Sequence, residues 1–229
     1  KINFCLVGEP TNPNRLGEMI KIGRRGSLTG KLIINGAQGH VAYPQRANNP
    51  STTIVKILNE LKNIKFDKGT KDFQPTNLEI TKININNTAD NVIPGLAKAV
   101  FNIRFNNKHS SNSLKKKINR IIKNICNKNK SKFKIEYNVS GEAFLTKPNK
   151  TTFMIQDTIK KITKLKPIFS TTGGTSDARF IRKISPCLEF GLVGKTMHKI
   201  DEVVALKDLK NLTLIYSSIL KNYFKWKQV

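Results

Sequence analysis

A carboxylate and an imidazole each follow an apolar segment, in positions that suit metal-assisted hydrolysis. Glu9 comes directly after the apolar run Ile2–Val7, and His198 comes shortly after Phe190–Val193. Ligands of α/β sheets bind at the carboxyl ends of strands, and carboxylate with imidazole is a donor set that Zn²⁺ takes. The spacing leaves open the alternative that Glu9 is an ordinary exposed loop residue.

Two glycine-rich segments could also contribute to a site. In residues 171–179, a Gly-Gly pair followed by hydroxyls offers backbone N–H groups to an anion. The alternative is an ordinary helix start capped by Ser176 or Asp177. The bend at residues 36–44 carries His40 and Tyr43, although a single histidine in a loop often has no functional role.

The charge first points to nucleic acid, but its distribution does not. Lys and Arg number 41 against 15 Asp and Glu, a net charge of +26. The lysines are spread along the chain, and the aromatic residues (7%) do not alternate with them as stacking platforms would. Lys, Asn and Ile share AT-rich codons, so a biased base composition accounts for much of the charge. We expect no nucleic-acid partner.

Hydropathy and cysteine content indicate a cytoplasmic protein. No run approaches the roughly 18 apolar residues of a membrane-spanning helix, so we expect no membrane partner. The three cysteines are few, odd in number and far apart, which favours a reducing compartment.

The middle of the chain predicts a ferredoxin-like βαββαβ unit, and the flanks predict an α/β layer. The expected middle elements are strand 27–35, helix 50–64, strands 77–85 and 97–105, a lysine-rich helix from Leu114, and strand 132–139. The expected flanking elements are strands 2–7, 167–170 and 187–190, and helices 153–165, 177–183 and 206–224. In the last helix we expect Leu209, Leu212, Ile215, Ile219 and Leu220 to face inward. The expected domain boundaries are 1–25, 26–140 and 141–229.

Eight segments together resemble the M20-type dizinc amidohydrolases, and within that family the succinyl-diaminopimelate desuccinylase branch. They occur in the family's order and cover nearly the whole chain: VGEPT (7–11), KIGRRGSLTG (21–30), GHVAYPQRANNP (39–50), DNVIPG (90–95), FNIRF (101–105), SGEAFLTKP (140–148), GGTSDARF (173–180) and MHKIDE (197–202). The resemblance implies part of a zinc-peptidase-like catalytic α/β domain with an inserted ferredoxin-like lid and dimerisation domain.

The resemblance also implies roles for particular residues. Glu9 and His198 match ligands of a pair of Zn²⁺ ions, for which Co²⁺ can substitute. His40 matches a histidine that stabilises the oxyanion and reaches the site from the partner subunit, so a homodimer is expected. The matched substrate-binding residues are Arg24, Ser27, Tyr43, Asn91, Arg104, Ser140, Gly174 and Thr175. The implied reaction hydrolyses N-succinyl-LL-2,6-diaminopimelate, a precursor in lysine and peptidoglycan synthesis.

The chain departs from the family in three ways. It contains no His-x-Asp and no Glu-Glu sequence, which carry the family's other metal ligands and general base. Because these ligands and the base are missing, we expect the chain alone to be inactive and to bind zinc poorly. Because Lys1 leads at once into a predicted strand, we also expect a chain cut within a domain. Gly194 and Asp90 stand where the family commonly has asparagine. A neighbouring M20 deacylase or peptidase, a basic nucleic-acid-binding module and an inactive dimerising remnant are the alternatives.

Overall fold

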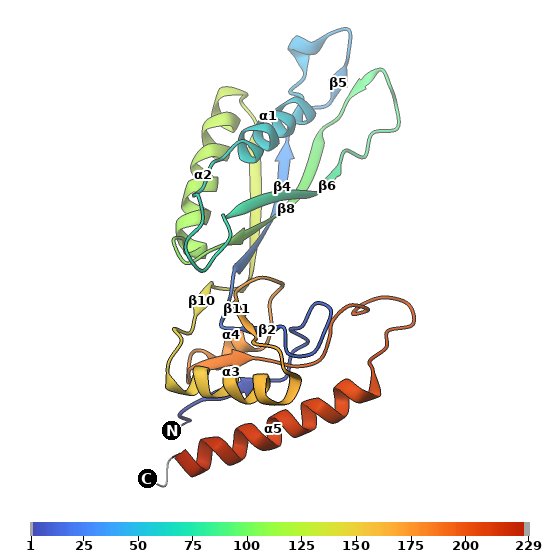
Figure 1. The fold of residues 1–229 in the computed structure, drawn as a ribbon. Helices are drawn as coiled ribbons and strands as arrows, with labels where there is room; N and C mark the ends of the chain where they lie inside the picture. The colour runs from blue at the N-terminus through green and yellow to red at the C-terminus, as the bar shows by residue number, and fades with distance from the viewer. Residues whose placement is uncertain (1, 227–229) are drawn as a thin grey trace. The chain divides into compact units, whose positions relative to one another are not determined.

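The computed structural model describes residues 2–226 and divides into two units (Figure 1). The inserted unit comprises Arg25–Ala143. The split unit comprises the residues up to Arg24 and those from Phe144 onward. The sequence predicted the inserted segment at 26–140.

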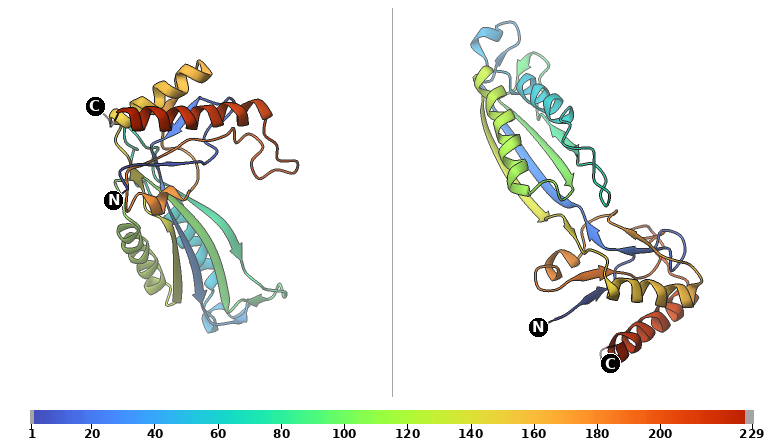
Figure 2. Two further views of the ribbon diagram at one scale, coloured as in Figure 1. Left: turned by 90° about the horizontal axis from the view of Figure 1, so that it is seen from below. Right: turned by 60° about the vertical axis from the view of Figure 1, so that its left-hand side comes forward.

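The inserted unit is an antiparallel sheet with the strand order β6-β8-β4-β9. Its strands are β4 (Gly26–Asn35), β6 (Asn77–Asn84), β8 (Leu96–Phe105) and β9 (Lys132–Gly141). Its helices are α1 (Pro50–Lys62) and α2 (Ser111–Lys128), which cover one face of the sheet (Figure 2). The predicted βαββαβ order is confirmed.

Alternating side chains make this sheet two-sided. Along β8, Phe101, Ile103 and Phe105 are fully buried beneath the helices, while Asn102 and Arg104 point to the other face. The Asn49 side chain caps α1 by accepting from the Ser51 N–H at 2.9 Å. The unit therefore has a core of its own on one face and a polar second face.

A short pair of strands forms the tip of the inserted unit beyond β4. β5 (Gly39–His40) pairs antiparallel with β7 (Val92–Ile93), and a 3₁₀ turn, η1, follows at Pro44–Arg46. The sequence predicted only a turn and a loop here, because two-residue strands are too short to show an alternating pattern.

The split unit has a mixed four-stranded sheet in the order β1-β12-β2-β11. Its strands are β1 (Cys5–Val7), β12 (Cys187–Glu189), β2 (Met19–Lys21) and β11 (Ile168–Ser170). β1 is parallel to β12, β2 is parallel to β11, and β12 meets β2 antiparallel. A separate pair joins β3 (Gly23–Arg24) to β10 (Phe144–Leu145). β1 is shorter than the predicted strand 2–7, and β2, β3 and β10 were not predicted.

Helices α3 (Lys150–Thr163) and α5 (Leu206–Trp226) lie side by side on one face of this sheet, as both views of Figure 2 show. The short helix α4 (Ala178–Ile181) packs with Phe144 and Cys187 in a separate cluster. This architecture confirms the predicted α/β class. In the described part of the chain, no helix combines the length and the apolar character needed to cross a membrane.

Two residues of α5 do not face inward as predicted. Leu212, Ile215 and Ile219 form the buried stripe, whereas Leu209 is 47% and Leu220 is 58% exposed. Leu220 is one residue past Ile219 and so lies about 100° around the helix from the stripe. Leu209 belongs to the first turns of α5, which extend past α3 (Figure 1).

Candidate metal and substrate site

The segment that carries Glu9 runs beside the segment that leads to His198. The Phe190 N–H donates to the Val7 carbonyl at 3.0 Å, and the Gly194 N–H donates to the Asn12 carbonyl at 2.9 Å. Both segments leave the carboxyl ends of the parallel strands β1 and β12. The structure therefore brings the two segments together across the sequence, at the edge of the sheet where α/β proteins bind ligands.

The Asn12 side chain holds these two segments together through hydrogen bonds. Its side-chain amide donates to the Gly191 carbonyl at 2.6 Å, and its Oδ1 accepts the backbone N–H groups of residues 17–19 at 2.8–3.1 Å. The side chain is buried, with 1% exposure. Sequence reasoning did not identify Asn12, because its partners lie 179 residues away and in a turn without an apolar pattern.

A glycine allows the close approach of the two segments. A Cβ at Gly191 would lie 2.4 Å from the Glu9 carbonyl oxygen, which is closer than real Cβ contacts. Any side chain at this position would push the Glu9 backbone away. The half-buried Glu9 therefore depends on Gly191 for its placement.

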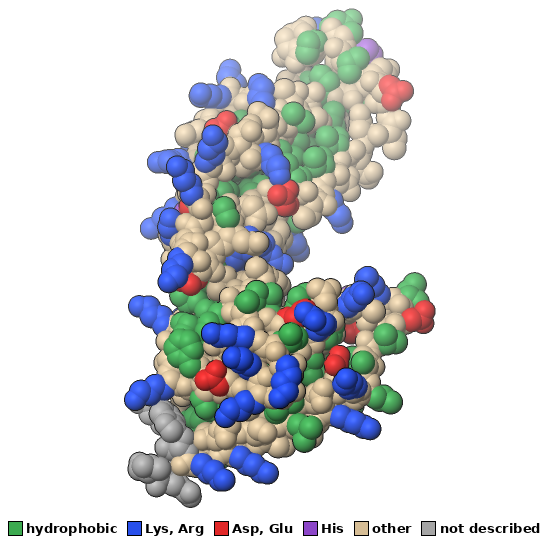
Figure 3. All heavy atoms as spheres, viewed as in Figure 1, with side chains coloured by type: hydrophobic (Ala, Val, Ile, Leu, Met, Phe, Trp, Pro, Cys, Tyr) green, Lys and Arg blue, Asp and Glu red, His purple; other side chains and the backbone are tan. Residues whose placement is uncertain are grey.

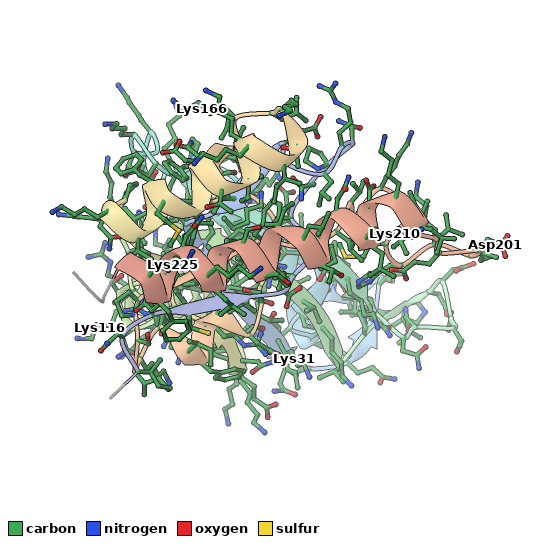
Figure 4. The ribbon with its side chains drawn as sticks, turned by 60° about the horizontal axis from the view of Figure 1, so that its bottom comes forward. Lys31, Lys116, Lys166, Asp201, Lys210 and Lys225 are labelled. Atoms are coloured by element: carbon green, nitrogen blue, oxygen red, sulfur yellow. The ribbon has the colours of Figure 1, made fainter. Side chains whose placement is uncertain are left out.

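His198 lies in an exposed loop that is closed at its base. The Thr196 hydroxyl donates to the Val203 carbonyl at 3.0 Å and accepts the Val203 N–H at 3.1 Å. His198 has a left-handed φ of 64°, and its N–H donates to Glu202 Oε2 at 3.3 Å. Figure 4 shows Asp201 at the outer end of this loop, beyond the start of α5.

Glu9 and His198 are donors of the types that zinc binds, but they do not form a complete centre. Among residues 2–226, no group of three or more His, Cys, Asp and Glu side chains is arranged to hold a metal ion. Zinc in proteins is usually four-coordinate. The donors described here could therefore fill only part of a zinc site.

Arg24 is engaged in a buried ion pair. Its Nε lies 3.0 Å from both carboxylate oxygens of Glu189, its Nη2 also donates to Glu189, and its Nη1 donates to the Thr172 carbonyl at 3.1 Å. Arg24 and Glu189 are 7% and 1% exposed. The guanidinium of Arg24 thus already binds one carboxylate, that of Glu189. The role in binding a substrate carboxylate that we expected for Arg24 stays a prediction. Sequence reasoning missed Glu189, for which the signal was an acidic residue within the apolar run 187–190.

The same ion pair holds the loop that carries Gly174 and Thr175. The Ser176 hydroxyl donates to Glu189 Oε1 at 2.6 Å, and Lys21 Nζ donates to the Thr172 hydroxyl at 2.6 Å. Burial, assisted by the nearby charge of Arg24, lowers the pKa of Lys21 to about 8.

Neither Ser176 nor Asp177 caps α4: the Asp177 side chain makes no capping hydrogen bond, and the Ser176 hydroxyl is bound to Glu189. The alternative of an ordinary capped helix start, which the sequence left open, is therefore not what the structure shows.

In the inserted unit, three predicted residues gather at the beginning of β4. Ser27 pairs in register with Arg104 on β8 and with Gly141 on β9, next to Ser140. The Asn102 amide donates to the Ser27 hydroxyl at 3.1 Å. Ser27 and Arg104 share the face of the sheet that α1 and α2 do not cover.

The other three predicted residues of the inserted unit gather at its tip. The rings of His40 and Tyr43 lie 5.9 Å apart, and the Val41 N–H donates to the Asn91 carbonyl at 3.0 Å. The Ala42 N–H donates to His40 Nδ1 at 3.1 Å, so a neutral His40 carries its proton on Nε2. His40 is exposed and can donate that proton to an oxygen atom. Asp90 is exposed beside this group.

Comparisons with known proteins agree with this architecture. Residues 22–130 match the family described as the peptidase dimerisation domain of M20 proteins. The chain is 79% identical over 224 residues to the succinyl-diaminopimelate desuccinylase of Pelagibacter ubique, covering 98% of this chain and 58% of the relative. It is 49% identical over 220 residues to that of Rickettsia bellii, covering 96% of this chain and 56% of the relative. The chain thus spans a little over half the length of these relatives.

Solved structures show the same fold. A tripeptidase from Staphylococcus aureus matches with a TM-score of 0.82 and 18% identity, over 96% of this chain and 57% of the other. An M20 family metallo-carboxypeptidase from Sulfolobus solfataricus matches with a TM-score of 0.76 and 16% identity, over 96% of this chain and 63% of the other. At these identities the similarity concerns the fold alone.

Proposed function

We propose that this chain belongs to the M20 family and is part of a metal-dependent amidohydrolase that cleaves N-succinyl-LL-2,6-diaminopimelate to succinate and LL-2,6-diaminopimelate. The observation that carries the proposal is 79% identity to a succinyl-diaminopimelate desuccinylase over 98% of the chain. The paired segments at Glu9 and Gly191 support it, because they present a carboxylate at the expected edge of the sheet. The free thiols of Cys5, Cys126 and Cys187 fit a cytoplasmic enzyme of lysine and peptidoglycan precursor synthesis.

In this proposal each residue group has one task. Glu9 and His198 are two ligands of a metal site with two Zn²⁺, or Co²⁺, that needs further donors. Such a site supplies Lewis-acid polarisation of the amide and a water of lowered pKa. His40 Nε2–H stabilises the negative oxygen of the tetrahedral intermediate, and Arg104 with Ser27 binds a substrate carboxylate. Gly174 and Thr175 contribute contacts from the loop that Glu189 holds.

The arrangement of the inserted unit favours a functional homodimer. A strand rise of about 3.4 Å per residue separates Ser27 from Asn35, at the two ends of β4, by about 27 Å. His40 lies beyond Asn35, so a small substrate bound at Ser27 and Arg104 cannot also reach His40 of the same unit. If a second subunit supplies His40, one substrate can contact Ser27, Arg104 and a His40 at the same time.

A neighbouring M20 deacylase or peptidase is the second candidate, since the solved structures of this fold include peptidases. A nucleic-acid-binding module has less support. On the face shown in Figure 3, Lys and Arg side chains are scattered over many elements and do not form one continuous patch.

The test uses a chimera in which this chain replaces the aligned portion of the Pelagibacter ubique desuccinylase. The rest of that enzyme is kept. The purified chimera, supplied with Zn²⁺, is assayed with N-succinyl- and N-acetyl-LL-2,6-diaminopimelate, and the chain alone is assayed in parallel. We expect succinate release by the chimera and none by the chain alone. In the chimera, Glu9→Gln and His198→Ala should each reduce kcat by at least about 10³-fold and lower the bound zinc. Asp157→Asn, at an exposed position of α3, serves as the control.

Two results would overturn the proposal. A folded chimera that binds zinc but leaves the succinylated substrate intact would exclude desuccinylation. Preference for the acetylated substrate would favour the second candidate. Titration with duplex DNA at moderate salt tests whether the chain is a nucleic-acid-binding module. Salt-dependent binding without hydrolysis would support that alternative.

A further inference from the structure

Two arginines share the uncovered face of the inserted unit's sheet. A Cβ at Gly26 would lie 2.2 Å from the Phe105 ring, so position 26 faces the core. The alternation along β4 then directs Ser27 to the opposite face. Arg104 lies there too, because it pairs in register with Ser27 and follows the buried Ile103. Arg25 precedes the strand and donates to the Asn77 side chain on β6, and Asn77 pairs in register with Arg104.

Each of these arginines has a buried nitrogen without a hydrogen-bond partner. The atoms are Arg25 Nε and Arg104 Nη1. Arg25 Nη1 is fixed by Asn77 Oδ1 at 2.9 Å and by the Pro75 carbonyl at 3.3 Å. A buried N–H without an acceptor costs free energy, so two in one place need an explanation.

The surrounding charges do not supply an acceptor. Burial and the positive charge of Arg104 lower the pKa of Arg25, so the two guanidinium groups repel each other. Neither forms an ion pair with a carboxylate of residues 2–226. Glu79 on the neighbouring strand is bound by Lys62 Nζ at 2.6 Å and by the Asn77 amide at 3.4 Å.

We propose that Arg25, together with Arg104, forms a two-guanidinium subsite that selects the terminal carboxylate of the substrate's acyl group. A carboxylate presents two oxygens, each able to accept from one of the two unpartnered N–H groups, and its charge relieves the repulsion between the arginines. Ser27 and the Asn102 amide that binds it border the same position. Arg25 is thus a specificity-determining residue, for which Asn77 sets the orientation. The identity of the anion rests on the proposed function.

The experiment measures binding of a carboxylate probe to the 229-residue chain. The chain is labelled with ¹⁵N-arginine, and the side-chain Nε–Hε resonances are followed during titration with succinate. Succinamide, of similar size and without charge, is the control ligand. We expect succinate to shift the Arg25 and Arg104 resonances in a saturable manner and succinamide to leave them in place. Arg25→Gln should weaken succinate binding about tenfold, and Arg25→Lys should weaken it less.

Arg120→Gln is the matched control variant, because it removes the same charge from the exposed face of α2 in the same unit. Backbone amide spectra show whether each variant is folded. The inference is overturned if folded Arg25→Gln binds succinate as tightly as Arg120→Gln does, or if succinamide shifts the same resonances.

The two proposals fail separately. In the chimera, Arg25→Gln should raise KM for the succinylated substrate and leave KM for the acetylated substrate unchanged. If succinate binds at the two arginines while the chimera hydrolyses nothing, the subsite stands and the proposed activity is wrong. If the chimera hydrolyses the succinylated substrate and Arg25→Gln leaves both its KM and succinate binding unchanged, the activity stands and the subsite is wrong.

Discussion

At the residue scale, we expect stability to depend more on the buried ion pair of Arg24 and Glu189 than on the exposed ion pairs. Glu189 accepts from Arg24 and from Ser176, so one carboxylate ties β3 to the loop after β11. Removing one partner of a buried ion pair leaves the other charge without compensation. The family resemblance implied a substrate-binding role for Arg24, and the structure shows its guanidinium bound to Glu189.

We expect Glu189→Gln to lower the free energy of unfolding of the split unit by about 3–5 kcal/mol, because Arg24 would stay buried without its counter-charge. Urea unfolding followed by far-ultraviolet circular dichroism measures the change. Arg15→Gln, which breaks the exposed pair of Arg15 and Glu18, is the control and should have little effect. If both variants lower the free energy of unfolding equally, the fold depends no more on the buried pair than on the exposed one.

Asp67 holds the loop before β6 through several hydrogen bonds. Its carboxylate accepts from the Asn106 amide and the Gly69 N–H, each at 2.6 Å, and lies 3.1 Å from His109 Nε2. Burial raises the pKa of Asp67, but hydrogen bonds, led by those from Thr76, outweigh it and lower the pKa to about 2.

The stability of the inserted unit should therefore depend on pH in a definite direction. The pKa of Asp67 in the folded protein lies below its ordinary value of 3.8, so its contribution is complete above that value and is lost as the pH falls toward 2. We expect Asp67→Asn to destabilise the unit by on the order of 1–2 kcal/mol at pH 6, and by progressively less between pH 4 and 2. Urea unfolding at each pH measures this, with Glu60→Gln as an exposed control. A difference that does not change with pH would contradict the assignment.

At the scale of elements, the loop between β11 and α4 is shaped by one glycine rather than by two. Gly173 has a φ of 104°, and a Cβ there would lie 2.3 Å from Arg24 Nη1. At Gly174, nothing lies within 4 Å of a Cβ. The sequence showed a Gly-Gly pair, and only the structure distinguishes the two positions.

Gly173→Ala should destabilise the split unit by about 1–3 kcal/mol, since the backbone strain and the contact with Arg24 act together. Gly174→Ala is the matched control and should leave the unfolding midpoint nearly unchanged. Thermal unfolding of both variants tests the distinction. If the two substitutions cost the same, the loop conformation described here is wrong.

At the scale of the whole molecule, the two units have separate cores. All buried residues of the largest cluster, from Leu28 to Cys126, belong to the inserted unit, and those of the second cluster belong to the split unit. A core that is complete within one unit predicts that the unit folds by itself.

We therefore expect the isolated segment 25–143 to fold cooperatively, with dispersed amide resonances and one sharp thermal transition. Within it, Phe101→Ala should lower the free energy of unfolding by about 3–5 kcal/mol, because the ring is fully buried between the sheet and the helices. Sedimentation measures whether the segment also dimerises, as the proposed supply of His40 requires. A poorly dispersed spectrum would contradict the separation of the cores.

The sequence by itself determined the elements whose patterns are periodic. The alternation in β8 and the three-to-four spacing in α1 and α2 predicted their types, because a side chain's position along a regular backbone decides whether it is buried. The order of these elements indicated the βαββαβ unit, and the eight family segments indicated M20 membership. For the candidate site, residue types and spacing pointed to Glu9 and His198, and the family resemblance added His40 and Arg104; the roles of these residues stay predictions.

The tertiary structure alone decided which residues meet. Asn12 with Gly191, Arg24 with Glu189, and Arg25 beside Arg104 are pairs whose members are far apart in the chain, and no local period records them. The short strands β2, β3 and β10 have only two or three residues each, so no alternating pattern marks them, and they are recognised by their backbone pairing with partners equally short. The fold brings these partners together, and the fold is set by the burial of apolar side chains from the whole of each unit.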